Sequence, residues 1–340
     1  MQTEQLVHTT RGYPASTYTV ENVHMGSVAV VDTSGELLWH AGNPLAKVFT
    51  RSALKPFQAL PFVLADGPAR FGLTSAELAL MCASHSGEPK HLATVEAILS
   101  KIGMDESHLE CGCGTPLYYD SVGLPVPAQP WRQLHHNCSG KHSGFLAWCR
   151  LHDLPSANYV DPAHPLQQAI RSRLAATVGM HPDSMPAGID GCSAPNYALP
   201  LTTLAHLFAR LASGSADPVH GAAMGDLCNA MTEHPDLVSG EARCDLAYMQ
   251  AGNGDWVTKV GADGVQAIGI RSAGLGIAIK IGDGAPRALQ AATFSVLDQL
   301  GLLDAKRRML LDHYRQPPLT NVRGSTVGDI RAVFKLERAR

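Results

Sequence analysis

The sequence carries little net charge and has no long apolar run. Charged residues make up 17% of the 340 residues, hydrophobic residues 45%, and the net charge is −3. This balance provides no basic surface for nucleic acid or for an anionic membrane. No segment approaches the roughly 20 apolar residues that a membrane-spanning helix needs. We therefore expect a small-molecule partner, with no nucleic acid and no membrane.

A secretory signal and a disulfide framework are also missing. Residues 1–11 are polar, which predicts a cytoplasmic protein. The eight cysteines stand at irregular spacings and include no Cys-x-x-Cys pair, so reduced thiols or metal ligands are expected. Four of them lie among apolar residues and are interpreted as small buried hydrophobes: Cys82, Cys149, Cys228 and Cys244.

Strand-like sequence lies near both ends of the chain. Residues 17–31 are rich in β-branched side chains, and after a turn at 32–35 the pattern resumes at 36–39, which predicts a β-hairpin. Alternating apolar segments return over 256–281. Because a few strands are more stable when they join a larger sheet, we expect one discontinuous antiparallel sheet.

The middle of the chain is dominated by helical periodicity. The predicted helices cover 57–65, 75–83, 92–102, 143–152, 166–178, 201–211 and 222–231, with two more at 285–300 and 304–314. The basic tail from Lys335 is expected to be loose. The fold class is therefore α+β: a sheet domain of residues 1–50 plus 255–340, and a large inserted, mainly helical domain of residues 51–254.

A serine stands three residues before a lysine where strand-like sequence gives way to helix. If Ser52 caps that helix, Lys55 lies one turn along on the same face, within reach of the hydroxyl. Pro56 requires the helix to begin very near Ser52. A neutral amine is needed to accept a serine proton, and a free lysine has a pKa of about 10.4. A second cation would lower that pKa, and Lys259 in a Lys-x-Gly sequence supplies one.

A lone Ser-x-x-Lys match also has a plain structural interpretation. Such a match is common by chance, and a helix cap followed by a solvated lysine would account for it. The cluster at 84–88 has the same ambiguity. It offers Ser84, an imidazole and a carboxylate, a combination typical of a functional site. The end of a helix, with Gly87 in the left-handed conformation, explains the same residues equally well.

Two glycine-containing loops each carry a thiol. Cys138 lies in a loop rich in histidine together with Lys141, and Cys192 follows Asp190 and Gly191. The thiols could bind a soft metal such as zinc, or be ordinary turn cysteines. The pair Cys111 and Cys113 is a rival, but its Cys-x-Cys spacing suits one tetrahedral ion poorly and is interpreted as a tight turn. A phosphate-binding loop is excluded, because the glycine spacing before Lys141 does not fit.

Five segments together resemble one known family. Residues 51–61, 84–88, 136–144, 190–195 and 259–264 are similar, in the same order, to the L-asparaginase II family of the Rhizobium etli inducible type, the class 3 L-asparaginases. The chain departs from the family's pattern at Asn22, Asn43 and Asp263, positions that bear on the outer shell of the site and on fine substrate specificity.

The resemblance implies an activity and a set of site residues. The activity is hydrolysis of L-asparagine to L-aspartate and ammonia, in a fold similar to serine β-lactamases and glutaminases. Ser52 with Lys55, and Ser84 with Lys259, would form two Ser-Lys pairs. Zinc would be bound by Cys138, Lys141 and Cys192, supported by Asp190 and His142, and the protein would form a homodimer. These assignments are what the resemblance implies.

Two rival functions remain open. A penicillin-recognising hydrolase or acyltransferase uses the same Ser-x-x-Lys and Lys-x-Gly sequences, but its substrates lie outside the cytoplasm and predict a secretory signal. A non-catalytic zinc-binding protein would use Cys138 and Cys192 structurally, with Ser52 as a cap. The identity of the nucleophile, Ser52 or Ser84, is also open, as is the preference between asparagine and glutamine.

Overall fold

The computed structural model describes residues 3–339 and divides the chain into two compact units. The sheet unit comprises Met1–Ala53, Leu199–Ala209 and Thr258–Arg340, and the helical unit comprises Leu54–Ala198 and Arg210–Val257. The α+β class is confirmed by the mixture of an antiparallel sheet and helices. The sequence places 199–209 with the helical domain, whereas this segment packs with the sheet.

Among the described residues, nine strands form the sheet of the sheet unit. They are β1 (Glu4–Arg11), β2 (Thr19–Asp32), β3 (Leu37–Ala41), β7 (Trp256–Gly261), β8 (Val265–Ile270), β9 (Leu275–Ile281), β10 (Pro318–Thr320), β11 (Thr326–Ala332) and β12 (Glu337–Arg338). The order is β10-β11-β1-β2-β9-β8-β7, with β3 paired to β2 and β12 paired to β3. A tenth strand, β4 (Lys47–Phe49), lies outside this sheet.

The predicted hairpin and its union with the C-terminal strands are both confirmed. The carboxylate of Asp32 accepts a hydrogen bond from the Ser34 main-chain N–H at 2.8 Å and closes the turn between β2 and β3. Strand β2 then pairs antiparallel with β9, with Val28 opposite Ile279. Both side chains are fully buried, so β-branched residues build the centre of the sheet.

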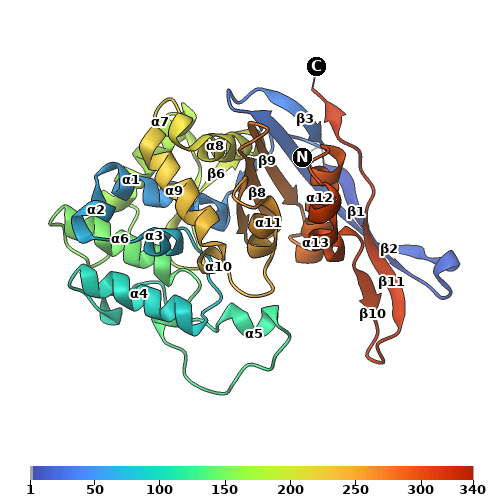
Figure 1. Cartoon of the computed structure of the whole chain (residues 1–340), viewed down its shortest axis with the longest axis horizontal. Helices are drawn as coiled ribbons and strands as arrows, with labels where there is room; N and C mark the ends of the chain where they lie inside the picture. Colours follow the sequence, from blue (N-terminus) through green and yellow to red (C-terminus); the bar gives the residue numbers. More distant parts are fainter. Residues whose placement is uncertain (1–2, 340) are drawn as a thin grey trace. The chain divides into compact units, whose positions relative to one another are not determined.

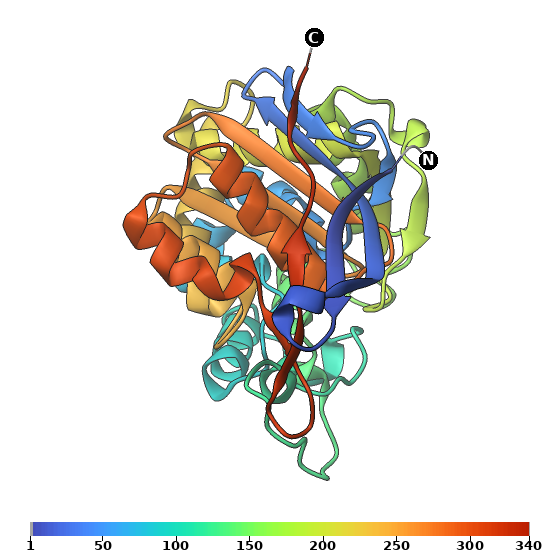
Figure 2. The ribbon, with the colours of Figure 1, turned by 90° about the vertical axis from the view of Figure 1, so that its right-hand side faces the viewer.

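Two C-terminal helices pack on this sheet. Helix α12 (Pro286–Gln299) contacts β1, β9 and β11, and α13 (Ala305–Arg315) packs against α12. Figure 2 shows both helices in front of β8 and β9. Helix α8 (Leu201–Ser213) approaches β9 closely at Gly276. A Cβ on this glycine would lie only 2.0 Å from the Ala205 carbonyl oxygen, so a larger residue would not fit.

The helical unit is built around a buried helix, α6 (Ser139–Leu151), which contacts α1, α3 and α4 (Figure 1). Residues 139–149 of α6 are all buried. The other elements are α1 (Lys55–Leu64), α2 (Gly67–Phe71), α3 (Ser75–Met81), α4 (Pro89–Lys101), α5 (Leu117–Ser121), α7 (Pro165–Val178), β5 (Ala187–Ile189), β6 (Pro195–Pro200), α9 (Gly221–Glu233), α10 (Pro235–Val238) and α11 (Cys244–Gly252). Each predicted helix in this region is present.

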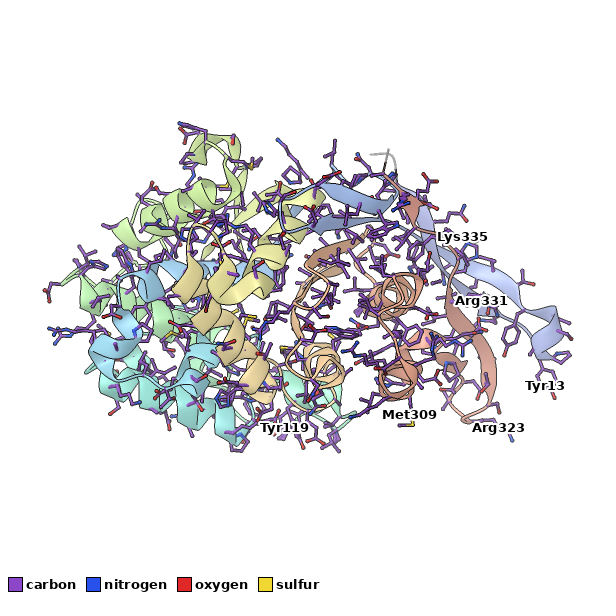
Figure 3. All side chains as sticks on the ribbon, turned by 45° about the horizontal axis from the view of Figure 1, so that its top comes forward. Tyr13, Tyr119, Met309, Arg323, Arg331 and Lys335 are labelled. Carbon is purple, nitrogen blue, oxygen red and sulfur yellow. The ribbon has the colours of Figure 1, made fainter. Side chains whose placement is uncertain are left out.

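Some predictions about the ends of the sheet are wrong. The tail from Lys335 is not loose, because β12 pairs with β3 and the Ala339 N–H donates to the Leu38 carbonyl. Strands β1, β10 and β11 are additional to those predicted. Tyr13 lies beyond the end of β1 and Arg323 in the turn between β10 and β11, and both side chains point outward (Figure 3).

One prediction about the cysteines is also wrong. Cys244 is half-buried, whereas Cys82, Cys149 and Cys228 are buried as predicted.

Candidate active site

The Ser52 segment forms a short turn of helix before α1. Ser52 lies within the 3₁₀ helix η2 (Arg51–Leu54), and Leu54 is the N-cap of α1 without a side-chain cap. The prediction that Ser52 caps the helix is therefore wrong. Pro56 is accommodated in the first turn of α1, where a missing N–H costs little. Arg51 has φ 49°, a left-handed conformation that is strained for a residue with a side chain.

The Lys259 strand lies directly against this turn. A Cβ at Gly261 would lie 2.9 Å from the Thr50 carbonyl oxygen and 3.2 Å from the Arg51 Cβ, so only glycine permits this approach. Residues two apart on a strand share a face, so Lys259 points to the same side of β7 as Gly261. Lys259 is fully buried, and its Nζ donates to the Val260 carbonyl at 2.9 Å. The Lys-x-Gly sequence thereby meets the Ser52 segment inside the sheet unit.

Lys55 and Ser84 form a direct hydrogen bond inside the helical unit. The Lys55 Nζ lies 2.9 Å from the Ser84 Oγ, 2.5 Å from the Ala83 carbonyl oxygen and 3.5 Å from that of Asn137. Lys55 is 1% exposed and Ser84 is 3% exposed. The contact joins one member of each predicted Ser-Lys pair, and the pairing itself stays a prediction.

The loop that carries Ser84 is fixed by its main chain. The Ser84 N–H donates to the Val238 carbonyl at 3.0 Å, and the Arg243 Nη1 donates to the Ser84 carbonyl at 2.7 Å. Gly87 has φ 75°, the left-handed conformation expected after a helix end. Arg243 was not singled out by the sequence, because no local pattern links it to residue 84. Ser84 is held on a rigid support and not on a flexible loop.

His85 is a buried, neutral part of the same support. Its Nδ1 accepts a hydrogen bond from the Gly87 N–H at 3.1 Å, so its Nε2 carries the proton and contacts the Ser139 Oγ at 2.9 Å. Its ring stacks on that of His91 at 5.1 Å between centroids. Burial lowers the pKa of His85 well below its ordinary value, and the charge of Lys55 adds to the shift. His85 therefore ties the Ser84 loop to the start of α6.

Cys138, Lys141 and Cys192 converge although Cys192 is far away in sequence. Cys138 is the N-cap residue of α6, and Lys141 lies in its first turn. Cys192 follows β5 in a turn where Ser193 has φ 68°. The Lys141 Nζ lies 2.8 Å from the Cys192 Sγ, and all three side chains are buried.

The charges of this cluster are strongly coupled. A hydrogen bond with Cys192 lowers the pKa of Cys138 well below its usual range, against the effect of burial, and the Lys55 and Lys141 ammonium groups add to it. Burial lowers the pKa of Lys141, but the thiolates of Cys192 and Cys138 more than offset this effect, and the pKa is raised. Within the cluster the electrostatics therefore favour the charged forms of both Cys138 and Lys141.

The supporting residues Asp190 and His142 lie beside the cluster. The carboxylate of Asp190 raises the pKa of Lys141 and accepts a hydrogen bond from the Gly191 N–H at 2.9 Å. His142 contacts the Tyr159 hydroxyl at 2.7 Å, and burial together with the Lys141 charge lowers its pKa to about 4. An imidazole with this pKa is neutral at physiological pH.

The Cys111 and Cys113 pair does not act as a unit. Cys113 is exposed, whereas Cys111 is buried and its Sγ lies 3.6 Å from the Gln133 carbonyl oxygen. Burial raises the pKa of Cys111 to about 12, and the nearby thiolates of Cys138 and Cys192 contribute. Cys111 is therefore a neutral thiol near the cluster. Gly112 between the two has φ 76°, which fits the predicted tight turn.

Two buried thiols and an amine suit a soft metal ion in their chemistry. Thiolates are strong zinc ligands, and Cys138 is already inclined to lose its proton. In residues 3–339 no group of three or more His, Cys, Asp and Glu side chains is arranged to hold a metal, so any ion here would need the Lys141 amine as a third protein ligand. That amine must first lose its proton, because an ammonium group has no lone pair.

A lysine amine in contact with a serine hydroxyl is one arrangement that can activate a nucleophile in an enzyme. The model of the L-asparaginase II family matches residues 7–332 of the chain. The chain belongs to the L-asparaginase II family, as its five motifs predict, and is a hydrolase of the amidase kind. None of the helices in the described part of the chain is long and apolar enough to cross a membrane.

Three solved structures are similar to the chain at low identity. A β-lactamase from Mycobacterium bovis is 14% identical over 81% of this chain and 94% of that chain, with a TM-score of 0.43. A β-lactamase candidate from Bacteroides dorei is 10% identical over 80% of this chain and 93% of that chain, with a TM-score of 0.45. A structure described as Mglu is 14% identical over 82% of this chain and 68% of that chain, with a TM-score of 0.37. No curated protein matches the chain at a significant level.

Proposed function

We propose that the protein hydrolyses L-asparagine to L-aspartate and ammonia through an acyl-enzyme intermediate. The observation that supports this most is the buried hydrogen bond between Lys55 and Ser84, in a chain of the L-asparaginase II family. An amine held in a dry site beside a hydroxyl can exchange protons with a reacting group. A homodimer is part of the proposal and rests on the resemblance alone, and a cytoplasmic location is proposed as well.

Ser52 is proposed as the nucleophile and Ser84 as the proton relay. Ser52 is half-buried, so a substrate can reach it, whereas Ser84 is 3% exposed. The Ser52 oxygen forms a bond to the side-chain amide carbon of asparagine, and its proton passes to the Ser84 hydroxyl, which gives its own proton to Lys55. The C–N bond then breaks, and Lys55 returns the proton to the departing ammonia. Water attacks the ester, aspartate leaves, and the serine regains a proton.

The step needs Lys55 as a neutral amine, whose lone pair can accept a proton. The Lys55 Nζ lies within hydrogen-bond distance of the Ala83 and Asn137 carbonyl oxygens and of the Ser84 hydroxyl, and it also bonds the Cys138 thiol group. The Ser84 hydroxyl is proposed as the route by which a proton reaches the amine. Lys259 is proposed to disfavour the charged form by like-charge repulsion.

Cys138, Lys141 and Cys192 are the residues that would hold zinc. The ion would supply a Lewis acid that orients the substrate. The part played by the protein is to keep the two thiols and the amine together at one end of α6, with Asp190 and His142 beside them. Because Cys138 neighbours both Lys141 and Lys55, the thiol cluster is connected to the Lys55–Ser84 contact within the helical unit.

The direct test is an assay for ammonia released from asparagine by the purified protein. Glutamine and a β-lactam are run in parallel. Release from asparagine at a higher kcat/KM than from glutamine, without β-lactam opening, supports the proposal. Opening of the β-lactam alone would support a penicillin-recognising hydrolase, and no turnover of any substrate by the folded protein with bound zinc would support a non-catalytic zinc-binding protein.

A further inference from the structure

A cavity of about 280 Å³ lies within the sheet unit, and none of its described lining residues belongs to the thiol cluster. Its apolar wall includes Ala46, Val48, Phe49 and Val265. Ala46, Val48 and Val265 are buried, whereas the Phe49 ring is 44% exposed and forms an uncovered apolar surface. A cavity of this size holds a small molecule and not a peptide.

The charged groups at the cavity are predominantly cationic. Lys47, Arg51 and Lys280 line it, and Asp263 is the one carboxylate among the described lining residues. An excess of cations on an apolar wall is complementary to an anion that has an apolar body. Of the single-charge anions of this kind, a short aliphatic carboxylate fits both the wall and the volume.

Lys280 is anchored in a way that leaves it able to bind. Its Nζ donates to the carbonyl oxygens of Asp263 and Ile281, the second at 2.8 Å. An ammonium group has three N–H donors, so one remains for a ligand. Burial lowers the pKa of Lys280, and the Arg51 charge adds to this, although Asp263 and Asp283 oppose it. A bound carboxylate would add to the counter-charge that Asp263 and Asp283 already supply to this half-buried ammonium.

Arg51 combines a strained backbone conformation with an ion pair that a ligand could replace. Its φ of 49° is unfavourable for a residue with a side chain, and strain of this type often marks functional positions. Its guanidinium pairs with Asp263, whose side chain is 67% exposed. The Asp263 side of the pair is largely open to water and is therefore screened, so a ligand carboxylate could replace Asp263 at small cost.

We propose that this cavity binds the carboxylate group of a short aliphatic acid, with Lys280 and Arg51 as its ligands and Asp263 as the competing anion. Arg51 directly precedes Ser52, so occupation of the cavity bears on the position of the proposed nucleophile. The acid is either a separate small molecule or the α-carboxylate end of the substrate. The binding itself does not depend on the proposed function, because it is measured without turnover.

Butyrate is the probe, and butyramide is its uncharged counterpart of the same shape. Binding to the full-length protein is measured by NMR titration at constant ionic strength. We expect butyrate to bind more tightly than butyramide by at least tenfold. Lys280→Met should weaken butyrate binding about tenfold or more and leave butyramide unchanged. The matched control is Lys306→Met, which removes an exposed lysine from α13 and should not change either affinity.

A second variant is expected to move the affinity in the opposite direction. Asp263→Asn removes the competing carboxylate and should tighten butyrate binding several-fold. Damage to the fold would not produce a gain in affinity, so the pair of variants separates binding from misfolding. Equal butyrate affinities in the wild type, Lys280→Met and Asp263→Asn would overturn the proposal, as would equal affinities for butyrate and butyramide.

Steady-state kinetics then identify the source of the carboxylate. If it is the substrate's own, Lys280→Met raises KM for asparagine but not for asparagine α-methyl ester, which lacks that charge. If it is a separate acid, Lys280→Met leaves both KM values unchanged, and butyrate changes kcat without competing with asparagine. Failure of the proposed reaction is a different result, since no ammonia would then be released while the binding differences persist.

Discussion

The Lys55 Nζ and the Ser84 Oγ lie 2.9 Å apart across 29 positions of sequence. Both side chains are buried, and the loop of Ser84 is fixed by main-chain hydrogen bonds on either side. A proton that enters this contact therefore meets a preorganised donor and acceptor. The roles of the surrounding residues can be separated by substitution.

Ser52→Ala should reduce ammonia release below about 1% of wild type, because a methyl group offers no nucleophile. The variant should fold, since Ser52 caps no helix. Ser84→Ala should lose less activity and keep an acyl-enzyme that mass spectrometry can map. In the wild-type protein, an acyl group mapped to Ser84 in place of Ser52 would make Ser84 the nucleophile. Substantial turnover by the folded Ser52→Ala protein would have the same meaning.

Lys55→Met and Lys259→Met should each lower kcat steeply, since each removes a buried amine from one proton-transfer system. The double variant should lose little more than either single variant, because the two lysines act on the same proton. The measurement is kcat for the three proteins, with circular dichroism to verify folding. A Lys259→Met protein with the kcat of the wild type would show that this lysine has only a structural role in β7.

Zinc should be found at one equivalent per chain when the protein is purified without chelator, and should be lost in Cys138→Ser and Cys192→Ser. Cys149→Ser is the matched control, because this thiol is buried elsewhere in α6. Removing the metal should raise KM more than it lowers kcat, because orientation and not nucleophile generation is proposed. Complete loss of turnover at saturating asparagine would contradict that role.

Zinc affinity should fall as the pH falls, because protons compete for the thiolates and for the Lys141 amine. The pKa of Cys138 is lowered, so protons compete for its thiolate only at lower pH. The pKa of Lys141 is raised, so its deprotonation is the harder step in metal binding. Metal affinity measured by competition with a chelator from pH 8 to pH 6 tests this. A pH-independent affinity would exclude Lys141 as a ligand.

His85 should make the protein less stable in mild acid. Its folded pKa lies well below the unfolded value of about 6.5, so below that pH the unfolded chain binds more protons. The stability present at neutral pH is then lost as pH falls from about 6.5 toward the folded pKa. His85→Gln keeps a donor and an acceptor but does not titrate. Its unfolding free energy, from urea titrations at pH 7 and pH 5, should depend less on pH than that of wild type.

Most of the fold could be predicted from periodicity, and the exceptions have local causes. Strand β11 contains Gly328, which by itself suggests a turn. In the structure a Cβ at this position would lie 1.8 Å from the Thr10 carbonyl oxygen, so glycine is needed where β1 and β11 approach. The requirement for glycine at position 328 arises from a strand about 320 residues away, so no local sequence pattern could reveal it. The short β10 begins at Pro318, another residue that suggests a loop.

The site could be predicted as a set of motifs but not as a set of contacts. The spacing of Ser52 and Lys55 is visible in the sequence, and so are the two thiol loops. The contact of Lys55 with Ser84, and that of Lys141 with Cys192, depend on how α1, α6 and the β5–β6 turn pack. Arg243 gave no signal, because it acts through the main chain of Ser84 and any long cation could do so.

The pairing of β12 with β3 has a consequence for self-association. A strand with unpaired N–H and C=O groups is a template for strands of other molecules. Glu337 and Arg338 occupy that position on β3 opposite His40 and Trp39, and both are charged and exposed. These two residues cover the hydrogen-bonding edge of β3 and so prevent another strand from pairing there. A chain shortened after Phe334 should keep its core but acquire a tendency to aggregate through β3.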